Sequence, residues 1–398
     1  MKWSDYSTGE RIKILRGKEI TQIDLAEMTG LSLATIQKHE QNKRISLGTL
    51  TRIADALHTN MSVLLGQSQV THGREAAERA MLRDLSHSVH AVAMGDVPDE
   101  VTPASDTDLV DIVDSAWEMY WDTEYDELGA VLPKLLATAR QSIHAAAAGA
   151  SQNAVGAMSE SFQIAAYLAN QFGMRDLAYA AISHAKGYAT QCGDVLRTAR
   201  VEAARSWIYR RDRRAPESLD IAQKAAALVE PSYSESTPER LTVYGNLMSH
   251  CAVAASRSGK KDLAIDCLSQ SHATAARLGH EHQVRGIMFG PVSAATKALD
   301  VKIYVGDIGQ ALELIKTVRG LDQLRPAARH RYRLDVALAQ AEASMWDASL
   351  DTLHGVATAA PQWVRNQALA AGIVQRVGNA STARLRQVSE LIGVRPYL

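Results

Sequence analysis

Five neighbouring residues combine polar, basic and apolar side chains at helical spacing: Ser32, Leu33, Ala34, Gln37 and Lys38. Positions 33, 34, 37 and 38 would share one face of a helix, because residues four apart lie one above the other. A glutamine can bridge the edge of an adenine, a lysine can donate to a guanine, and apolar side chains can contact a thymine methyl group. Side chains of these types at this spacing could contact base edges if the helix lay in the major groove of DNA.

A second group of side chains flanks this helix and suits contacts with phosphate oxygens. Its members are hydroxyl, amide and basic residues: Thr21, Gln22, Thr35, Lys43 and Arg44. Phosphate contacts set the register of a protein on DNA without reading its sequence. We expect this role for the group, although Lys43 and Arg44 would equally fit a solvated turn.

Short helices must hold these side chains in place. Thr21 and Asp24 have the spacing of a capping box, so a helix is expected to begin there and to end at Gly30. Ser32 can cap the helix that follows. The apolar periodicity predicts five helices within residues 9–66, at about 9–17, 22–30, 33–41, 47–57 and 61–66.

Residues 1–66 resemble the Xre-type, lambda-repressor-like helix-turn-helix family. The matching residues are Thr21 to Ser32, Ile36, Glu40, Lys43-Arg44, Leu50 to Leu57 and Leu64 to Gly66. The resemblance implies a five-helix DNA-binding domain whose partner is double-stranded DNA. The sequence departs from the family pattern in two respects: Leu33-Ala34 replace a polar or basic first turn, and His39 replaces an apolar residue.

The remaining chain is expected to be helical throughout. Residues 67–106 predict a linker with one helix near 75–94, and residues 107–398 predict a series of helical pairs. The pairs would turn near 122–124, 173–176, 211–214, 259–262, 306–309 and 345–347. This part resembles divergent tetratricopeptide repeats, and the whole chain resembles actinobacterial Xre-type regulators with such repeats. The expected fold class is all-α, with an α-solenoid behind the DNA-binding domain.

The first helices of these pairs carry aromatic and polar residues that would suit a peptide or a small molecule. The candidates are Tyr167, Trp207, Tyr244, Asn246 and His250. Aromatic residues at helical spacing also build cores, so a purely structural role competes with this interpretation.

Composition and motifs limit the classes of protein to which this chain could belong. The chain has 398 residues, a net charge of −1 and three cysteines without metal or disulfide spacing. It has no apolar run long enough for a membrane span and no signal core at the N-terminus, so we expect a cytoplasmic protein. No phosphate-binding loop or zinc-protease motif occurs, since His280-Glu281-His282 lacks the required spacing. We expect neither enzymatic activity, nor a metal, nor a cofactor.

Two functions fit these observations. One is a dimeric, sequence-specific transcriptional regulator, whose repeats serve dimerisation and could also sense a peptide or small molecule. The other is a protein–protein adaptor, in which the repeats bind a partner protein and the N-terminal domain has little DNA binding.

Overall fold

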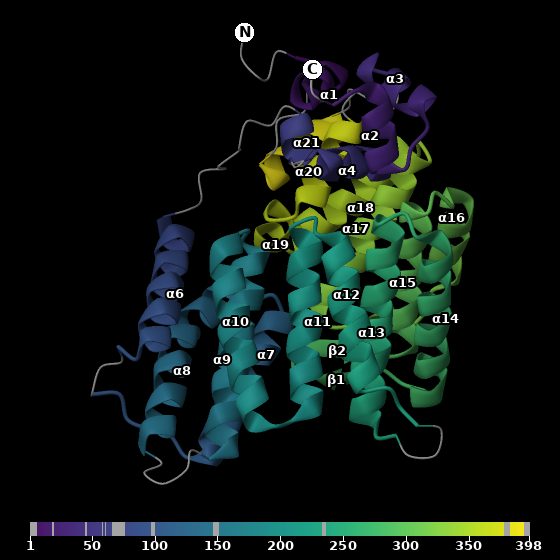
Figure 1. Ribbon diagram of the computed structural model, residues 1–398. Coiled ribbons are helices and arrows are strands. Elements are labelled where there is room, and N and C mark those ends of the chain that lie inside the picture. The colour runs from purple at the N-terminus through teal and green to yellow at the C-terminus, as the bar shows by residue number, and fades with distance from the viewer. Residues whose placement is uncertain are drawn as a thin grey trace. The chain divides into compact units, whose positions relative to one another are not determined.

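A computed structural model describes residues 6–17, 20–43, 46–57, 59, 61–65, 76–96, 100–145, 151–232, 236–377 and 383–393. Its elements are almost entirely helices, which confirms the all-α prediction (Figure 1). The chain forms two compact units. Unit 1 contains residues 1–73, 299–317 and 330–398, and unit 2 contains residues 74–298 and 318–329. The boundaries expected from the sequence, at 66 and 106, stay a prediction.

The N-terminal helices of unit 1 surround a small apolar core. Ile12, Leu25, Ile36, Leu50 and Ile53 are at most 1% exposed, and each comes from an apolar position of the predicted periodicity. The helices are α1 (Thr8–Arg16), α2 (Gln22–Thr29), α3 (Leu33–Glu40), α4 (Leu47–Ala56) and α5 (Met61–Leu64). All five lie where the sequence predicted them.

Helical pairs make up most of the remaining chain. After α6 (Ala76–Met94), the pairs are α7 (Asp106–Trp121) with α8 (Tyr125–Ala145), α9 (Gln152–Gln171) with α10 (Arg175–Cys192), α11 (Val195–Arg211) with α12 (Ala215–Leu228), α13 (Pro238–Arg257) with α14 (Lys261–Leu278), α15 (Pro291–Tyr304) with α16 (Ile308–Thr317), and α17 (Pro326–Glu342) with α18 (Trp346–Ala359). The chain closes with α19 (Pro361–Arg365), α20 (Ala368–Val377) and α21 (Ala383–Ile392). All six predicted turns are confirmed.

The turn within each pair repeats one backbone conformation. The second residue after the first helix has a positive φ between 64° and 85° in every pair: Thr123, Gly173, Arg213, Gly259, Gly306 and Ser344. This left-handed conformation suits glycine, because a Cβ atom there approaches the following carbonyl oxygen. Three pairs nevertheless use other residues, so the repeat is preserved in the backbone where the sequence has diverged.

Hydrogen bonds from buried serines also join the two helices of several pairs. Ser159 of α9 donates to the carbonyl of Ala185 at 2.9 Å, and Ser349 of α18 donates to the carbonyl of Ala337 at 2.8 Å. The α11–α12 and α13–α14 pairs place two serines face to face, Ser206 with Ser218 and Ser249 with Ser271, each at 2.9 Å. Small side chains at these positions let the helix axes approach closely, and their hydroxyls satisfy one another or a backbone carbonyl.

Unit 2 also contains a β-hairpin that the sequence analysis did not predict. Strand β1 (His282–Val284) pairs antiparallel with β2 (Ile287–Phe289), and all three residues of β2 are buried. Phe289 packs against Gly245 of α13, where an added Cβ atom would lie 2.1 Å from the ring. The hairpin therefore belongs to the core of unit 2.

Candidate nucleic-acid interface

The start of α2 is held by a reciprocal capping box. The backbone N–H of Asp24 donates to Oγ1 of Thr21 at 3.1 Å, and the N–H of Thr21 donates to Oδ2 of Asp24 at 2.8 Å. These bonds satisfy backbone groups that a helix end leaves without partners. Hydrogen bonds from the backbone N–H and the side chain of Thr21 lower the pKa of the Asp24 carboxyl, because they favour its ionised form.

A tight turn then leads from α2 to α3. Gly30 has φ 61° and ψ 28°, the left-handed conformation that ends many helices, and Nη2 of Arg52 donates to its carbonyl at 3.3 Å. Ser32 follows as the N-cap of α3, and its Oγ accepts from the N–H of Thr35 at 3.2 Å. The connection between α2 and α3 is thus defined at both ends, as the sequence predicted.

Helix α3 presents the predicted base-contacting residues to solvent. Its buried side is formed by Ile36, which is fully buried, and His39, which is 8% exposed. All five candidates are exposed: Ser32, Leu33, Ala34, Gln37 and Lys38. Leu33 is 37% exposed, although it is a large apolar side chain at the start of an otherwise polar surface. An exposed helix face with this composition has the shape and chemistry to enter a major groove.

The predicted phosphate contacts have mixed surroundings. Thr21 and Lys43 are exposed, whereas Gln22 and Thr35 are half-buried; Arg44 lies outside the described residues. Thr35 shares a hydrogen bond of 2.8 Å with Ser32, and Nε2 of Gln22 donates to Glu40 at 2.6 Å. Among the described residues of this group, Lys43 is the basic one, and its side chain is exposed.

A buried ion pair that the sequence analysis missed holds α1, α2 and α3 together. Nε of Arg16 donates to Oε1 of Glu40 at 2.7 Å, and the two side chains are only 13% and 5% exposed. The second carboxylate oxygen accepts from Gln22. One carboxylate at the end of α3 is thus bonded to both preceding helices and sets the orientation of α3.

The loop after α3 is fastened to the start of α1. The N–H of Gly9 donates to Oδ1 of Asn42 at 2.7 Å, and Asn42 has φ 61°. A Cβ atom at Gly9 would lie 2.5 Å from the carbonyl oxygen of His39, so only glycine permits this approach. The contact places Lys43 directly beyond the end of the exposed helix.

Comparison with known families agrees with this geometry. Residues 12–66 match the model of the Cro/C1-type HTH DNA-binding domain. This match confirms the helix-turn-helix prediction for the N-terminal part of the chain. None of the curated proteins matches the chain.

The five residues predicted to bind an effector come from three helices: α9, α11 and α13. Tyr167 is 7% exposed, and its ring lies 4.8 Å from the ring of Trp207. Tyr244 is directed to α14, because its hydroxyl donates to Oε1 of Gln270 at 3.1 Å. Asn246 and His250 on α13 remain half-buried. Burial lowers the pKa of His250 well below its ordinary value, and the nearby charges of Arg210 and Lys297 lower it further.

The tip of the hairpin contacts the first helices, where the effector was expected. Nε1 of Trp121 donates to the carbonyl of Arg285 at 2.8 Å, and the hydroxyl of Tyr167 donates to the carbonyl of Gly286 at 3.2 Å. Nη1 of Arg285 pairs with Asp114 at 2.8 Å. Tyr167, which the sequence analysis predicted to contact a ligand, therefore contacts the hairpin of the chain itself.

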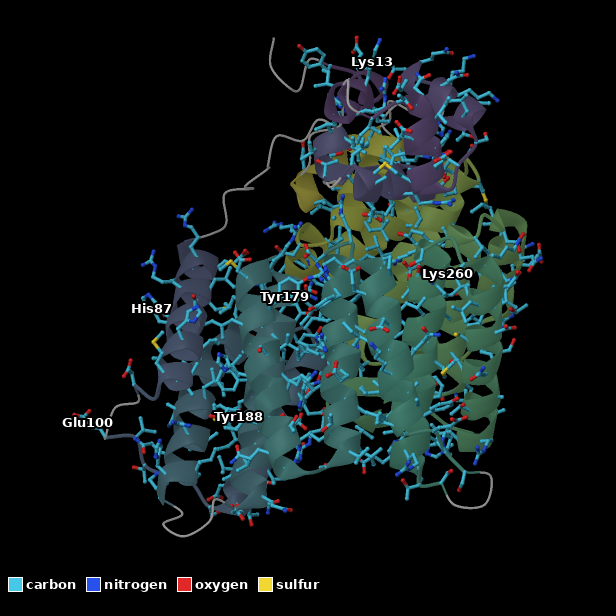
Figure 2. The ribbon with its side chains drawn as sticks, viewed as in Figure 1. Lys13, His87, Glu100, Tyr179, Tyr188 and Lys260 are labelled. Atoms are coloured by element: carbon cyan, nitrogen blue, oxygen red, sulfur yellow. The ribbon has the colours of Figure 1, made fainter. Side chains whose placement is uncertain are left out.

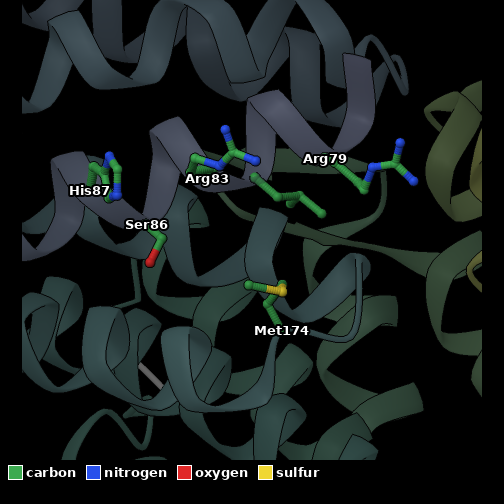
Figure 3. Close-up of a pocket in the computed structure, with 6 residues that line it drawn as sticks. Arg79, Arg83, Ser86, His87 and Met174 are labelled. Carbon is green, nitrogen blue, oxygen red and sulfur yellow. The ribbon is translucent and has the colours of Figure 1, made fainter. Parts of the chain in front are cut away.

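A separate hollow of about 360 Å³ lies between α6 and the start of α10 (Figure 3). Leu82 and Met174 supply apolar surface, and Arg79, Arg83 and His87 follow one another at every fourth position of α6.

Among the described residues, no group of histidine, cysteine and acidic side chains could hold a metal ion. The described helices also include none whose length and apolar character would carry it across a membrane.

Proposed function

We propose that this chain is a sequence-specific DNA-binding transcriptional regulator that acts as a homodimer. The observation that carries the proposal is the exposed face of α3, presented by a capped helix pair within the Cro/C1-type domain. The side chains of Gln37 and Lys38 are assigned to base edges. Lys43 is assigned to a phosphate.

The helical pairs are assigned two roles in this proposal. They supply the dimer contact, and they respond to a peptide or small molecule. Asn246 and His250 support the second role, because both keep part of their surface accessible on a helix that also borders the hairpin. A ligand can change DNA binding only by as much as it prefers one arrangement of the protein, and a tenfold effect needs about 1.4 kcal/mol of such preference.

The first experiment is selection of a binding motif from randomised duplexes with the full-length protein. Lys38→Ala should then relax discrimination at one base position by roughly 1–3 kcal/mol. Lys43→Ala should weaken all sequences alike and reduce the salt dependence by about one counterion.

Lys13→Ala is the matched control, since Lys13 lies on the exposed surface of α1 (Figure 2) and has no assigned DNA contact. It should leave the selected motif unchanged. Enrichment of no motif by the full-length protein would contradict sequence-specific binding, and would favour the adaptor function.

A further inference from the structure

The DNA-binding domain makes specific contacts with the C-terminal helices of unit 1. The backbone N–H of Leu47, the first residue of α4, donates to Oε1 of Glu342 on α17 at 2.8 Å. The first N–H groups of a helix have no partner within it, and the helix dipole favours a negative charge there. Glu342 therefore stabilises the start of α4 from a position 295 residues further along the chain.

The same carboxylate is bound by a third helix. Nη2 of Arg376 on α20 donates to Oε2 of Glu342 at 3.0 Å, and the two side chains are 10% and 7% exposed. Each oxygen of Glu342 thus has a different partner. Removal of this buried carboxylate would be costly, because each of its two partners would lose a charge-assisted hydrogen bond.

Apolar contacts lie beside this carboxylate. A Cβ atom at Gly372 of α20 would lie 3.2 Å from Cε of Met61 and 3.6 Å from Cδ2 of Leu47. Leu47 and Met61 are 5% and 8% exposed. At Gly372, α20 therefore passes within van der Waals reach of side chains from both α4 and α5. Tyr304 of α15 lies near Gly48 on the same side of α4.

The docked domain keeps its candidate DNA surface free. The contacts with the C-terminal helices come from the first turn of α4 and from α5, whereas the base-contacting candidates on α3 are exposed. Docking and DNA binding thus use different faces of the domain. A domain held in this way can present α3 in one orientation.

We propose that α17 and α20 form the docking surface for the N-terminal DNA-binding domain, and that Glu342 and Gly372 specify the docked orientation. The consequence for regulation rests on the proposed function: a change within the C-terminal helices would reorient α3 through this contact. The docking itself is independent of DNA, so it can be tested without it.

The test is amide hydrogen exchange of the full-length protein in the absence of DNA, followed in peptides that cover α4 and α5. Glu342→Gln keeps the shape of the side chain and removes its charge. It should raise exchange at the start of α4 by about tenfold, as expected when one charge-assisted hydrogen bond is weakened. Gly372→Leu should raise exchange in both α4 and α5, because the new side chain would occupy the space of Met61 and Leu47.

Two controls separate docking from general unfolding. Gly355→Leu introduces the same side chain on α18, where an added Cβ atom meets nothing within 4 Å, and should leave α4 unchanged. Exchange in α9 and α13 reports whether unit 2 stays folded. If Glu342→Gln and Gly372→Leu both leave exchange of α4 and α5 at the parent level, docking is refuted. That outcome would not affect the DNA-selection result, so the two proposals fail independently.

Discussion

At the scale of single residues, the carboxylate of Glu40 sets the orientation of α3. Glu40→Ala removes the carboxylate that pairs with Arg16 and that accepts from Gln22, whereas Nη1 of Arg16 keeps the carbonyls of Gly17 and Ile20 as acceptors. Removal of one partner from a partly buried hydrogen-bonded pair destabilises a protein by about 1–3 kcal/mol. We expect this loss in the local stability of α1 to α3, measured by hydrogen exchange.

Glu27→Ala provides the comparison for this substitution. Glu27 is exposed on α2, so its removal should change stability by no more than about 0.5 kcal/mol. Equal effects of the two substitutions would contradict the role assigned to Glu40.

His39 makes the same domain sensitive to acid. Burial lowers the pKa of its imidazole, and the nearby charge of Lys38 lowers it further. The unfolded chain therefore binds a proton more readily than the folded domain. Stability contributed by neutral His39 is present above the unfolded pKa of about 6.5 and is lost as the pH falls from there towards the lowered folded pKa.

His39→Leu should abolish this part of the pH dependence, since leucine does not titrate. The measurement is unfolding of the DNA-binding domain within the full chain at pH 7.5 and pH 5.5. His87→Leu is the control, because His87 is exposed on α6 (Figure 2) and should leave the acid sensitivity of α1 to α5 in place. An undiminished loss of stability at low pH in His39→Leu would assign the effect to other groups.

Residues that act locally were predictable, and residues that act across the fold were not. The caps at Thr21 and Ser32 and the exposed face of α3 follow from neighbours within four positions. The pair Arg16–Glu40 joins residues 24 positions apart, and the pair Glu160–Arg200 joins residues 40 positions apart. No helical period relates such partners, so the sequence pattern does not pair them.

At the scale of elements, the repeated turn offers a direct test of backbone strain. Thr123 has φ 65°, a conformation that costs a residue with a Cβ atom about 1–2 kcal/mol. Glycine removes this cost but loses about 0.5–1 kcal/mol to the greater freedom of the unfolded chain. Thr123→Gly should therefore stabilise unit 2 by up to about 1 kcal/mol.

The reverse change at another pair supplies the control. Gly173 occupies the same place in the α9–α10 turn, and an added Cβ atom there meets nothing within 4 Å. Gly173→Thr should destabilise unit 2, because only the backbone conformation opposes it. Thermal unfolding of both variants measures the difference. A stabilising Gly173→Thr would show that the shared φ does not determine these turns.

The helices were predictable because each carries its own boundary signals, whereas the hairpin carries few. Its turn is Arg285-Gly286, and Arg285 has the positive φ of 55° that a glycine usually adopts. Gly286 is needed for another reason: an added Cβ atom would lie 2.4 Å from the ring of Trp117. The order of residues therefore lacks the usual hairpin signal, and the hairpin depends on tertiary contacts with α7, α9 and α13.

At the scale of the whole molecule, each compact unit is built from segments that are not continuous in sequence. One compact unit groups residues 1–73 with 299–317 and 330–398. The division expected from the sequence, into residues 1–66, a linker with one helix over 67–106, and residues 107–398, stays a prediction. Contacts such as Leu47 with Glu342 arise from the folded arrangement of distant segments, so local sequence patterns do not predict them.

Specific recognition of DNA should require two copies of this chain. One α3 helix offers two side chains for polar contacts with base edges, Gln37 and Lys38, and each is worth roughly 1–3 kcal/mol of discrimination. Their sum of roughly 2–6 kcal/mol, at most about 10⁴-fold, is too little against the roughly 10⁶–10⁹ competing sites of a genome, whereas two half-sites combine their discrimination. We expect a near-palindromic operator with half-site centres about 34 Å apart or at a multiple of that distance.

Light scattering of the full-length protein should accordingly give twice the chain mass of 43.2 kDa, both free and on DNA. The location of the contact can be tested in the same experiment. The DNA-binding domain exposes Ile23 and Met28 by 57% and 50%, so it has apolar surface of its own on α2. If the helical pairs form the dimer, Ile23→Ser with Met28→Ser should leave the mass unchanged. A fall to the mass of one chain would move the interface to α2, and a parent protein that is monomeric with and without DNA would refute dimeric recognition altogether.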